Sequence, residues 1–516
     1  MSAPRLLRPP IPERIAFDGV VVLGAGLAGL SAALAAAPRP VLLVSSGKVG
    51  EDCSSAWAQG GMAAALADGD EPALHAADTI AAGAGLCDRE AVEILAREGP
   101  RAVGALAALG APFDRDADGG FRLSLEAAHS RARVARVGGD GAGAAITVAA
   151  ARAVKAAAHV TIRQGLSGRA LLLDPEGRVR GIMVRDRDHD RWIEIVSPAT
   201  ILATGSLGGL YAVTTNPSGA RGEGLALAAL AGAEILDPEF VQFHPTALDL
   251  GLDPAPLATE ALRGEGARLV NASGEPFMAG YHAAADLAPR DIVARAVEAE
   301  RRAGRGAFLD ARDAIGARFP EEFPTVFAAC MAAGVDPRVD LAPVAPAAHY
   351  HMGGIRTDAW GRTSLEGLFA AGECAGAGIH GANRLASNSL IEAAVFGRRA
   401  AEAARDAVDP GTAPLVARPA AEPDAATMAA LRRRMSRDAG IVRDGAGLRG
   451  LLAWLDTAGG DALPMVAARL VVEAALARRE SRGGHFRADF PREAEAAVHS
   501  LRTLAVASSG PRRAAA

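Results

Sequence analysis

Gly24-Ala25-Gly26-Leu27-Ala28-Gly29 is the stretch of sequence that decides the fold. The apolar residues 19–23 precede it, and a second apolar run, residues 27–36, overlaps its end. This order predicts a strand, a tight turn and a helix, followed by a parallel strand at residues 41–44. Glycines at this spacing let the turn hold a dinucleotide pyrophosphate at the start of the helix. We therefore expect the opening βαβ unit of a dinucleotide-binding fold.

One position departs from this pattern. An acidic residue that binds ribose is typical about 20 residues after the first glycine, at the end of the second strand. Ser45 and Ser46 occupy that place. A serine hydroxyl still forms a hydrogen bond with ribose, although a weaker one, and Ser46 is the candidate.

The composition bounds the class of protein. The chain has 516 residues, of which 50% are hydrophobic and 22% charged, so it is long enough for two or three globular domains. A net charge of −5 gives no basic field for nucleic acid or anionic lipid. We expect neither of these partners, while a small anion in a local cationic pocket stays possible.

Neither the cysteines nor the first apolar run indicates a metal site or a membrane. The cysteines are far apart and form no Cys-x-x-Cys pair, which argues against a metal site and fits a reducing cytoplasm; they are Cys53, Cys87, Cys330 and Cys374. Residues 20–37 contain the three turn glycines and end at Pro38-Arg39-Pro40. We expect a strand and a helix there rather than a transmembrane segment.

Further apolar runs predict the division into domains. Two of them stop at glycine, in Ala203-Thr204-Gly205 and in Phe369-Ala370-Ala371-Gly372, as strands beneath a cofactor often do. The residues between these runs include a part rich in proline, charge and short helices, which indicates an inserted capping domain. Prolines after residue 405 mark a linker, and helical periodicity returns at 427–436 and 463–479. We predict a cofactor-binding domain at 1–241 and 353–405, a capping domain at 242–352, a linker at 406–425 and a C-terminal helical domain at 426–516.

A second informative stretch is Ile-His-Gly-Ala-Asn-Arg-Leu-Ala-Ser-Asn-Ser-Leu-Ile-Glu at 379–392, which places an arginine before a predicted helix. Arg384 offers a planar pair of donors to a carboxylate, and the positive end of the helix suits an electron-rich ring. Together with the glycine turn, this stretch indicates a flavoenzyme that acts on a small acid.

Four more motifs place cations and hydroxyls in turn-like settings. They are Gln242-Phe243-His244-Pro245-Thr246, Thr259-Glu260-Ala261-Leu262-Arg263-Gly264-Glu265-Gly266, Ala288-Pro289-Arg290-Asp291 and Ala347-Ala348-His349-Tyr350-His351-Met352-Gly353-Gly354. Arginine, histidine and threonine supply the donors that the two carboxylates of a dicarboxylic acid need. One such motif alone would be unremarkable, but their joint occurrence indicates a dicarboxylate site.

With Ala58-Gln59-Gly60-Gly61 and residues 380–390, these motifs make the chain similar to the L-aspartate oxidase family, within the succinate dehydrogenase and fumarate reductase flavoproteins, over nearly its full length. The resemblance implies an α/β + α fold: a Rossmann-like FAD-binding domain with an inserted α+β capping domain and a C-terminal helical domain. It implies hydride transfer from Cα of L-aspartate to flavin N5, giving iminoaspartate, with oxygen or fumarate reoxidising FAD. In this family the product supplies quinolinate synthase in NAD biosynthesis.

The resemblance also implies that FAD is bound non-covalently. Respiratory members often attach FAD through a histidine, and that position reads Ser54 here. Where this chain has Glu223, the family pattern has aspartate, so the carboxylate here reaches farther from the backbone than the aspartate would. The implied contacts run from the pyrophosphate turn to the isoalloxazine, and they are Gly24, Ala25, Gly26, Leu27, Ala28, Gly29, Ser46, Ser54, Ser55, Ala56, Trp57, Ala58, Gln59, Gly60, Gly61, Leu166, Ser167, Glu223, Glu373, Ser389 and Leu390.

The same resemblance assigns residues to the substrate. It implies that Arg290 transfers a proton with Glu260 and Arg263 as its relay. It implies that the substrate carboxylates are held by the side chains of His244, Thr259, His351 and Arg384, with a further hydrogen bond from Ser387.

Glu126 is the candidate for substrate choice, because a carboxylate pairs with the α-ammonium of aspartate, which succinate lacks. In the family stretch two glycines follow this glutamate, and here Ala127 and Ala128 replace them.

Two alternatives remain open. The first is a soluble fumarate reductase or succinate dehydrogenase flavoprotein, which would use the same FAD domain and carboxylate clamp; Glu126 and Ser54 argue against it. The second is a catalytically silent FAD-binding subunit of a larger complex. The presence of Arg290, His244, His351 and Arg384 argues against that alternative.

Overall fold

The computed structural model describes residues 12–408, 415–417, 419–458 and 462–504. Part of the predicted linker and both ends of the chain therefore lie outside the described residues. Within the described ranges, no helix combines the length and the apolar character needed to cross a bilayer.

A five-stranded parallel sheet forms the centre of the molecule, in the order β18-β11-β2-β3-β7. Its strands are β2 Val20–Leu23, β3 Val41–Val44, β7 Val160–Arg163, β11 Ala199–Leu202 and β18 Leu368–Ala370. The predicted βαβ unit is confirmed, because β2 and β3 pair in parallel and α1 Leu27–Ala35 connects them. All of β2 is buried, which explains its continuous run of apolar residues.

The two faces of this sheet pack against different layers. On β2, Val20 and Val22 belong to one apolar core, whereas Val21 and Leu23 belong to another, because neighbouring side chains on a strand point to opposite faces. The first core includes the helices α1, α3 Arg89–Ala108, α4 Ala142–Ala156 and α10 Asn388–Ala404. The second core includes a sheet in the order β1-β10-β9-β8, made of β1 Glu13–Ala16, β8 Leu166–Leu173, β9 Val179–Asp186 and β10 Arg191–Val196.

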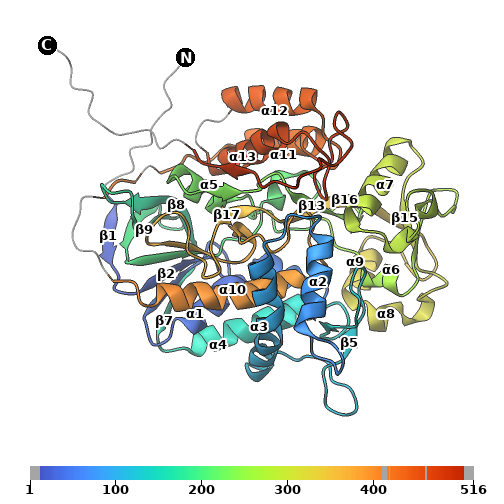
Figure 1. Cartoon of the computed structure of the whole chain (residues 1–516), viewed down its shortest axis with the longest axis horizontal. Helices are drawn as coiled ribbons and strands as arrows, with labels where there is room; N and C mark the ends of the chain where they lie inside the picture. The colour runs from blue at the N-terminus through green and yellow to red at the C-terminus, as the bar shows by residue number, and fades with distance from the viewer. Residues whose placement is uncertain (1–11, 409–414, 418, 459–461, 505–516) are drawn as a thin grey trace.

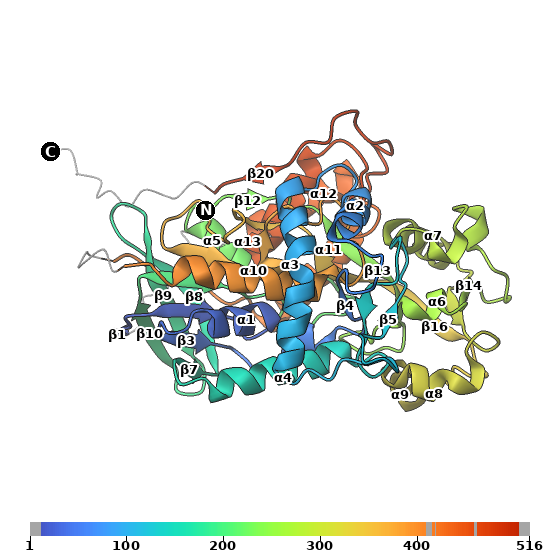
Figure 2. The ribbon, with the colours of Figure 1, turned by 60° about the horizontal axis from the view of Figure 1, so that its bottom comes forward.

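A separate body projects from one end of the molecule, at the right of both ribbon views (Figures 1 and 2). Its sheet has the order β13-β16-β15-β14, and its core draws on residues between Leu248 and Val344. Its main elements are β13 Val241–Leu248, α6 Ala261–Gly264, β14 Arg268–Val270, α7 Arg290–Arg302, β15 Phe308–Asp310, α8 Phe319–Glu322, α9 Pro324–Ala332 and β16 Ala342–His351. We keep 242–352 as the proposed limits of this capping domain.

Three helices near the C-terminus pack beside α5 Glu223–Leu230, and they lie at the top of Figure 1. The predicted helices at 427–436 and 463–479 correspond to α11 Ala425–Asp438 and α13 Leu463–Ala477. Between them lies α12 Gly445–Ala458, which the sequence did not predict because its three glycines weaken the helical signal. It forms because Leu448, Leu451 and Leu455 are buried in the core.

Small sheets complete the fold around these layers. One has the order β4-β6-β5, from β4 Met62–Ala63, β5 Leu123–Ser124 and β6 Val134–Ala135, and α2 Pro72–Ala82 packs against α3 nearby. The other has the order β19-β17-β12-β20, from β12 Ile235–Leu236, β17 Gly354–Arg356, β19 Ala375–Gly376 and β20 Leu501–Arg502.

Candidate active site

A cavity of about 520 Å³ runs from the glycine turn to the capping domain. Its volume lies in the range of small-molecule and cofactor sites. Most of the predicted site residues line it. Those on the cofactor side are Gly24, Ala25, Gly26, Leu27, Ala28, Ser46, Ser54, Ser55, Trp57, Ala58, Gln59, Gly60, Gly61, Leu166, Ser167, Glu223, Glu373, Ser389 and Leu390; those on the substrate side are Glu126, His244, Thr259, Glu260, Arg290, Arg384 and Ser387.

The glycine turn brings backbone N–H groups close to the cavity. Gly24 has φ +113°, and a Cβ there would lie 2.1 Å from the carbonyl oxygen of Ala203. A Cβ on Gly29 would lie 1.9 Å from the carbonyl oxygen of Gly24. Gly29 does not line the cavity, because its role is this close packing between turn and helix. A larger residue at either position would displace the start of α1.

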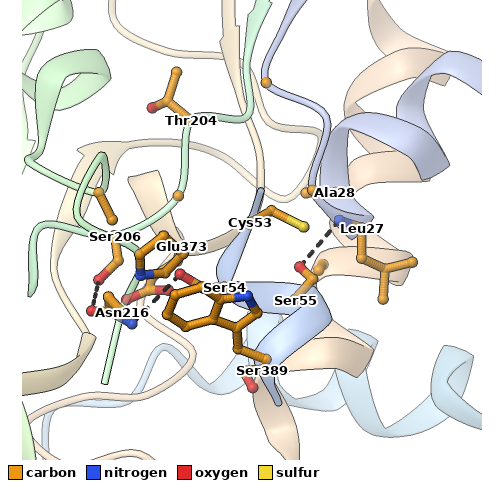
Figure 3. A pocket seen from close by; sticks show the side chains of 18 of the residues that line it. Leu27, Ala28, Cys53, Ser54, Ser55, Thr204, Ser206, Asn216, Glu373 and Ser389 are labelled. Atoms are coloured by element: carbon orange, nitrogen blue, oxygen red, sulfur yellow. Dashed lines mark hydrogen bonds between the residues drawn. The ribbon is translucent and has the colours of Figure 1, made fainter. Parts of the chain in front are cut away.

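The start of α1 fits a pyrophosphate. The N–H of Leu27 donates to Ser55 Oγ at 3.1 Å, so the hydroxyl of the wrapping segment Ser54–Trp57 already lies at the helix end (Figure 3). The N–H groups of a helix N-terminus favour a negative group. In the same wall Asn216 donates to Ser54 Oγ at 3.5 Å and accepts from Ser206 Oγ at 2.9 Å (Figure 3). Ala56 does not line the cavity, although both of its neighbours do.

Two half-buried carboxyl groups lie on the cofactor side. Burial raises the pKa of Glu223, and it raises the pKa of Glu373 to about 7. Glu373 accepts a hydrogen bond from the backbone N–H of His351 at 2.9 Å. Carboxyl groups of this kind suit the hydroxyls of a ribose or ribityl chain, since they accept hydrogen bonds without requiring a counter-ion.

The substrate end contains a relay of charged groups from the capping domain. Arg290, the first residue of α7, donates from Nε to Glu260 Oε2 and from Nη1 to Gln242 Oε1 at 3.2 Å. Arg263 Nη2 lies 3.8 Å from Glu260 Oε2. Although burial raises the pKa of Glu260, the two guanidinium groups outweigh it and hold the pKa below its usual range. Glu260 is therefore a carboxylate, and Arg263 supports it from behind the cavity rather than lining it.

Arg384 enters the same end from the segment before α10. Its guanidinium lies 4.5 Å from the centre of the Tyr350 ring, and its Nε has no hydrogen-bond partner among the described residues. Burial and the nearby Arg290 lower its pKa to about 10, so it remains a cation at neutral pH. A buried cation with an unused donor suits a carboxylate ligand.

Glu126 faces this cation-rich end from a different loop. It is buried, and its Oε2 accepts a hydrogen bond from Ser387 Oγ at 2.8 Å. Burial and then the neighbouring Glu260 raise its pKa. Within the part of the chain that the structure describes, no cation contacts this carboxyl directly, which suits a ligand that brings a positive charge.

Two histidines lie in this end of the cavity, and one of them is not the residue that the sequence predicted. His244 and His349 line the cavity, with ring centres 5.1 Å apart. Burial lowers the pKa of both well below the usual value, so both are neutral. The backbone N–H of Thr246 donates to His244 Nδ1 at 3.3 Å, which leaves the proton on Nε2.

The assignment of His351 to the substrate requires correction. Its Nε2 lies 3.1 Å from the carbonyl oxygen of Pro238, and it does not line the cavity. The reason is a β-bulge: Gln242 pairs with Tyr350 and Phe243 with Ala348, so His349 is the extra residue of β16. A bulge reverses the alternation of side chains, and it directs His349 rather than His351 to the ligand side.

His351 is expected to make folding pH-dependent. Burial lowers its pKa to about 4, so the unfolded chain binds the proton first as pH falls below the ordinary pKa near 6.5. Its contribution is complete above pH 6.5 and is lost between pH 6.5 and 4. The variant His351→Gln keeps a hydrogen-bond donor for Pro238. In thermal melts between pH 6.5 and 4, its free energy of unfolding should fall by about 3 kcal/mol less than that of the unchanged chain. The exposed His189→Gln is the control, and a parallel pH profile for His351→Gln would contradict the assignment.

Sequence reasoning missed several polar residues of the cavity wall. They are His349, Tyr350, Thr204, Ser206, Thr215 and Asn216. Thr215 Oγ1 lies 2.8 Å from His349 Nδ1, and Asn216 donates to the carbonyl oxygen of His349 at 3.1 Å. His349 and Tyr350 stood within a quoted motif, but Thr215 and Asn216 carry no motif of their own. Among the described residues, no group of three or more His, Cys, Asp or Glu side chains is arranged to hold a metal ion.

Comparisons with known proteins agree with this geometry. Residues 19–390 match the family model described as FAD binding domain, and residues 461–512 match the one described as fumarate reductase flavoprotein C-term. The L-aspartate oxidase of Caulobacter vibrioides is 62% identical, with 97% of this chain and 99% of that protein covered. The L-aspartate oxidase of Agrobacterium fabrum is 49% identical, with 93% and 92% covered. A solved structure of a mutant of E. coli quinol fumarate reductase FrdA superposes with a TM-score of 0.86 at 28% identity, covering 95% of each chain.

Proposed function

The chain belongs to the L-aspartate oxidase family of FAD-binding flavoproteins, and on this premise we propose that it oxidises L-aspartate to iminoaspartate, with oxygen or fumarate as the electron acceptor. The observation that carries the proposal is the charge pattern at the substrate end of the cavity. Two cations, Arg290 and Arg384, lie there with two buried carboxyls: Glu260 pairs with Arg290, whereas Glu126 lies on a different loop and forms no ion pair among the described residues. This pattern is complementary to two carboxylates and one ammonium group.

The cofactor side of the cavity supports non-covalent FAD. The N–H groups of residues 25–28 would hold the pyrophosphate, and the segment 54–61 would contact the rest of the cofactor. Glu373 and Glu223 would accept hydrogen bonds from the ribityl and ribose hydroxyls, and Ser389-Leu390 at the start of α10 would contact the isoalloxazine. When bound, FAD supplies the site that accepts a hydride from Cα of the substrate and passes two electrons to the acceptor.

The side chains at the substrate end bind and orient the dicarboxylate. Arg384 holds one carboxylate through its free donor, and the neutral His244 and His349 add hydrogen bonds with the Thr259 hydroxyl. His349 takes the role that sequence reasoning gave to His351. Charged and planar contacts of this kind fix the orientation of Cα before reaction.

Arg290 and Glu260 move the proton. When fumarate is the acceptor, a guanidinium N–H of Arg290 would donate a proton to the substrate carbon. Glu260, held as a carboxylate by Arg290 and Arg263, stabilises that guanidinium and would pass on to it a replacement proton that arrives from Arg263. The free pKa of arginine is too high for ordinary acid catalysis at neutral pH. Proton donation by Arg290 therefore has to be concerted with bond formation at the substrate carbon, which becomes strongly basic as the reduction proceeds.

We also propose a cellular role. The product is an imine that hydrolyses in water, so a following enzyme has to consume it, and quinolinate synthase in NAD biosynthesis is the proposed consumer. The four free thiols favour the cytoplasm as the location. Soluble fumarate reductase activity remains the second candidate, because the same fold and clamp serve it.

Turnover without oxygen tests the proposed function. The holoenzyme is mixed with L-aspartate and fumarate, and we expect equal amounts of succinate and of oxaloacetate plus ammonia, the hydrolysis products of the imine. D-aspartate should give none. Formation of succinate from an artificial reductant but not from L-aspartate would assign the chain to the fumarate reductases instead.

A further inference from the structure

Two unusual backbone turns meet at Glu126. Ala128, two residues after it, has φ +65°, and Ser387, which donates to its carboxylate, has φ +61°. Residues other than glycine rarely adopt this left-handed region, and they persist there when surrounding contacts hold them. A Cβ on Gly60 would lie 2.9 Å from Ser387 Oγ and 3.3 Å from Glu126 Oε1, so this glycine leaves the space for their contact. The contacts that hold the two turns therefore set the position of the Glu126 carboxyl.

His129 joins the two turns. Its Nε2 lies 3.0 Å from the carbonyl oxygen of Ala386, the residue before Ser387, and its Nδ1 lies 3.4 Å from Arg133 Nη1. Since a carbonyl oxygen accepts and a guanidinium donates, the neutral ring carries its proton on Nε2. Burial lowers the pKa of His129, which favours this neutral form. The ring thus transmits the position of Arg133 to the turn at Ser387.

Arg133 is the buried anchor of the loop that carries Glu126. The loop, residues 125–133, connects the paired strands β5 and β6. The Arg133 side chain is 0% exposed and donates to Asp70 at 3.0 and 2.9 Å through Nε and Nη2, and to Asp78 through Nη1. Buried guanidinium groups with two carboxylate partners have a fixed orientation.

Asp78 holds the loop at a second point. Its Oδ2 also accepts from the backbone N–H and the hydroxyl of Ser130, each at 2.8 Å. Asp78 belongs to α2, and α2 holds the other turn as well: His75 Nε2 lies 2.8 Å from Asn388 Oδ1, and Asn388 Nδ2 donates to Thr79 Oγ1 at 3.0 Å. One helix therefore braces both the Glu126 loop and the start of α10.

We propose that Asp78 and Arg133 are positioning residues that hold Glu126 at the substrate ammonium and thereby set the preference for an amino dicarboxylate over a plain one. The inference rests on the proposed function, because it concerns how that substrate is distinguished. Neither residue lines the cavity, so both act through the loop. Arg290 lies on another segment, and Arg384 precedes the turn at Ser387, which α2 also holds through Asn388. Loosening the loop should therefore affect recognition of the ammonium more than that of the carboxylates.

Asp78→Asn is the test, because it keeps the size of the side chain and removes its charge. We expect KM for L-aspartate to rise about 10-fold, as for loss of one charged contact, while kcat/KM for fumarate reduction by a chemical reductant changes less than about 2-fold. FAD content should be unchanged. The matched control is Asp489→Asn, which breaks a bidentate pair with the buried Arg487 in the C-terminal domain and should leave both activities unchanged.

A double-mutant cycle separates positioning from general damage. If Asp78 acts through Glu126, then Asp78→Asn adds little to the loss in Glu126→Gln. The inference would be overturned if the losses from Asp78→Asn and Glu126→Gln multiplied in the double mutant. It would also be overturned if Asp78→Asn lowered aspartate oxidation and fumarate reduction equally. If Asp78→Asn does not yield folded holoenzyme, Ser130→Ala takes its place, and we expect KM for L-aspartate to rise about 2-fold. An unchanged ratio of aspartate oxidation to fumarate reduction would contradict the inference. Failure of the proposed function is distinct, since the unchanged enzyme would then not oxidise L-aspartate.

Discussion

Replacing Arg290 with leucine should abolish turnover while leaving FAD bound. Loss of a positioned proton donor costs about 10²- to 10⁴-fold in rate, so we expect kcat for fumarate reduction to fall by at least about 10³-fold. A similar loss is expected for aspartate oxidation, because Arg290 is one of the two cations at the substrate end of the cavity. The loss should be large because Arg290 also compensates the charge of Glu260 in a buried site. Without it, Arg263 at 3.8 Å is the remaining cation that contacts Glu260 among the described residues, so the Glu260 pKa should rise and the relay should lose its carboxylate form.

Flavin absorbance and steady-state rates measure the two parts of this prediction. The matched control is Arg295→Leu, one turn later on α7, whose side chain pairs with Asp291 and lies over the ring of Phe486. It should retain activity. Full activity in Arg290→Leu would assign the proton step to another group, and loss of FAD would show that the substitution acts on the fold of the capping domain.

Glu126→Gln should change substrate preference rather than abolish activity. A hydrogen bond to a charged group contributes about 1.5–3 kcal/mol, so kcat/KM for L-aspartate should fall about 10- to 100-fold. Glutamine keeps the size of the side chain and its contact with Ser387, so the carboxylate clamp at Arg384 is preserved. Fumarate has no ammonium group, and its reduction should change less than about 3-fold.

The assay compares the two substrates on the same preparation of holoenzyme. Ser387→Ala is a useful companion, because it removes the hydrogen bond to Glu126 but not the carboxylate, and we expect a smaller loss in the same direction. Equal losses for aspartate and fumarate in Glu126→Gln would remove its discriminating role. The carboxyl would then be a structural partner of Ser387.

Much of the fold was predictable because its signals are local. The strands that flank the glycine turn and the two later strands that end near glycine all lie in one parallel sheet. These elements depend on apolar runs and on turn geometry, which a sequence displays directly. Helix α12 was missed because its packing against the core outweighs a weak intrinsic preference.

The candidate site was predictable to the level of residue types and less so in geometry. Arg384 was found because its motif precedes a predicted helix, and Arg290 and Glu126 because the stretches that hold them resemble those of the L-aspartate oxidase family; all three line the cavity. The choice between His349 and His351 failed because a bulge is set by the pairing of two distant strands. The ion pairs of Arg133 with Asp70 and Asp78 could not be predicted for the same reason, because the folded chain brings together residues that form no motif in the sequence.

The most direct test of the central claim is to mix the oxidised holoenzyme with L-aspartate in the absence of oxygen and follow the flavin absorbance. We predict that L-aspartate bleaches the oxidised band, that D-aspartate and succinate do not, and that fumarate or air restores it. Bleaching by succinate without bleaching by L-aspartate would contradict the account and identify a dicarboxylate dehydrogenase, in which Glu126 does not contact the substrate.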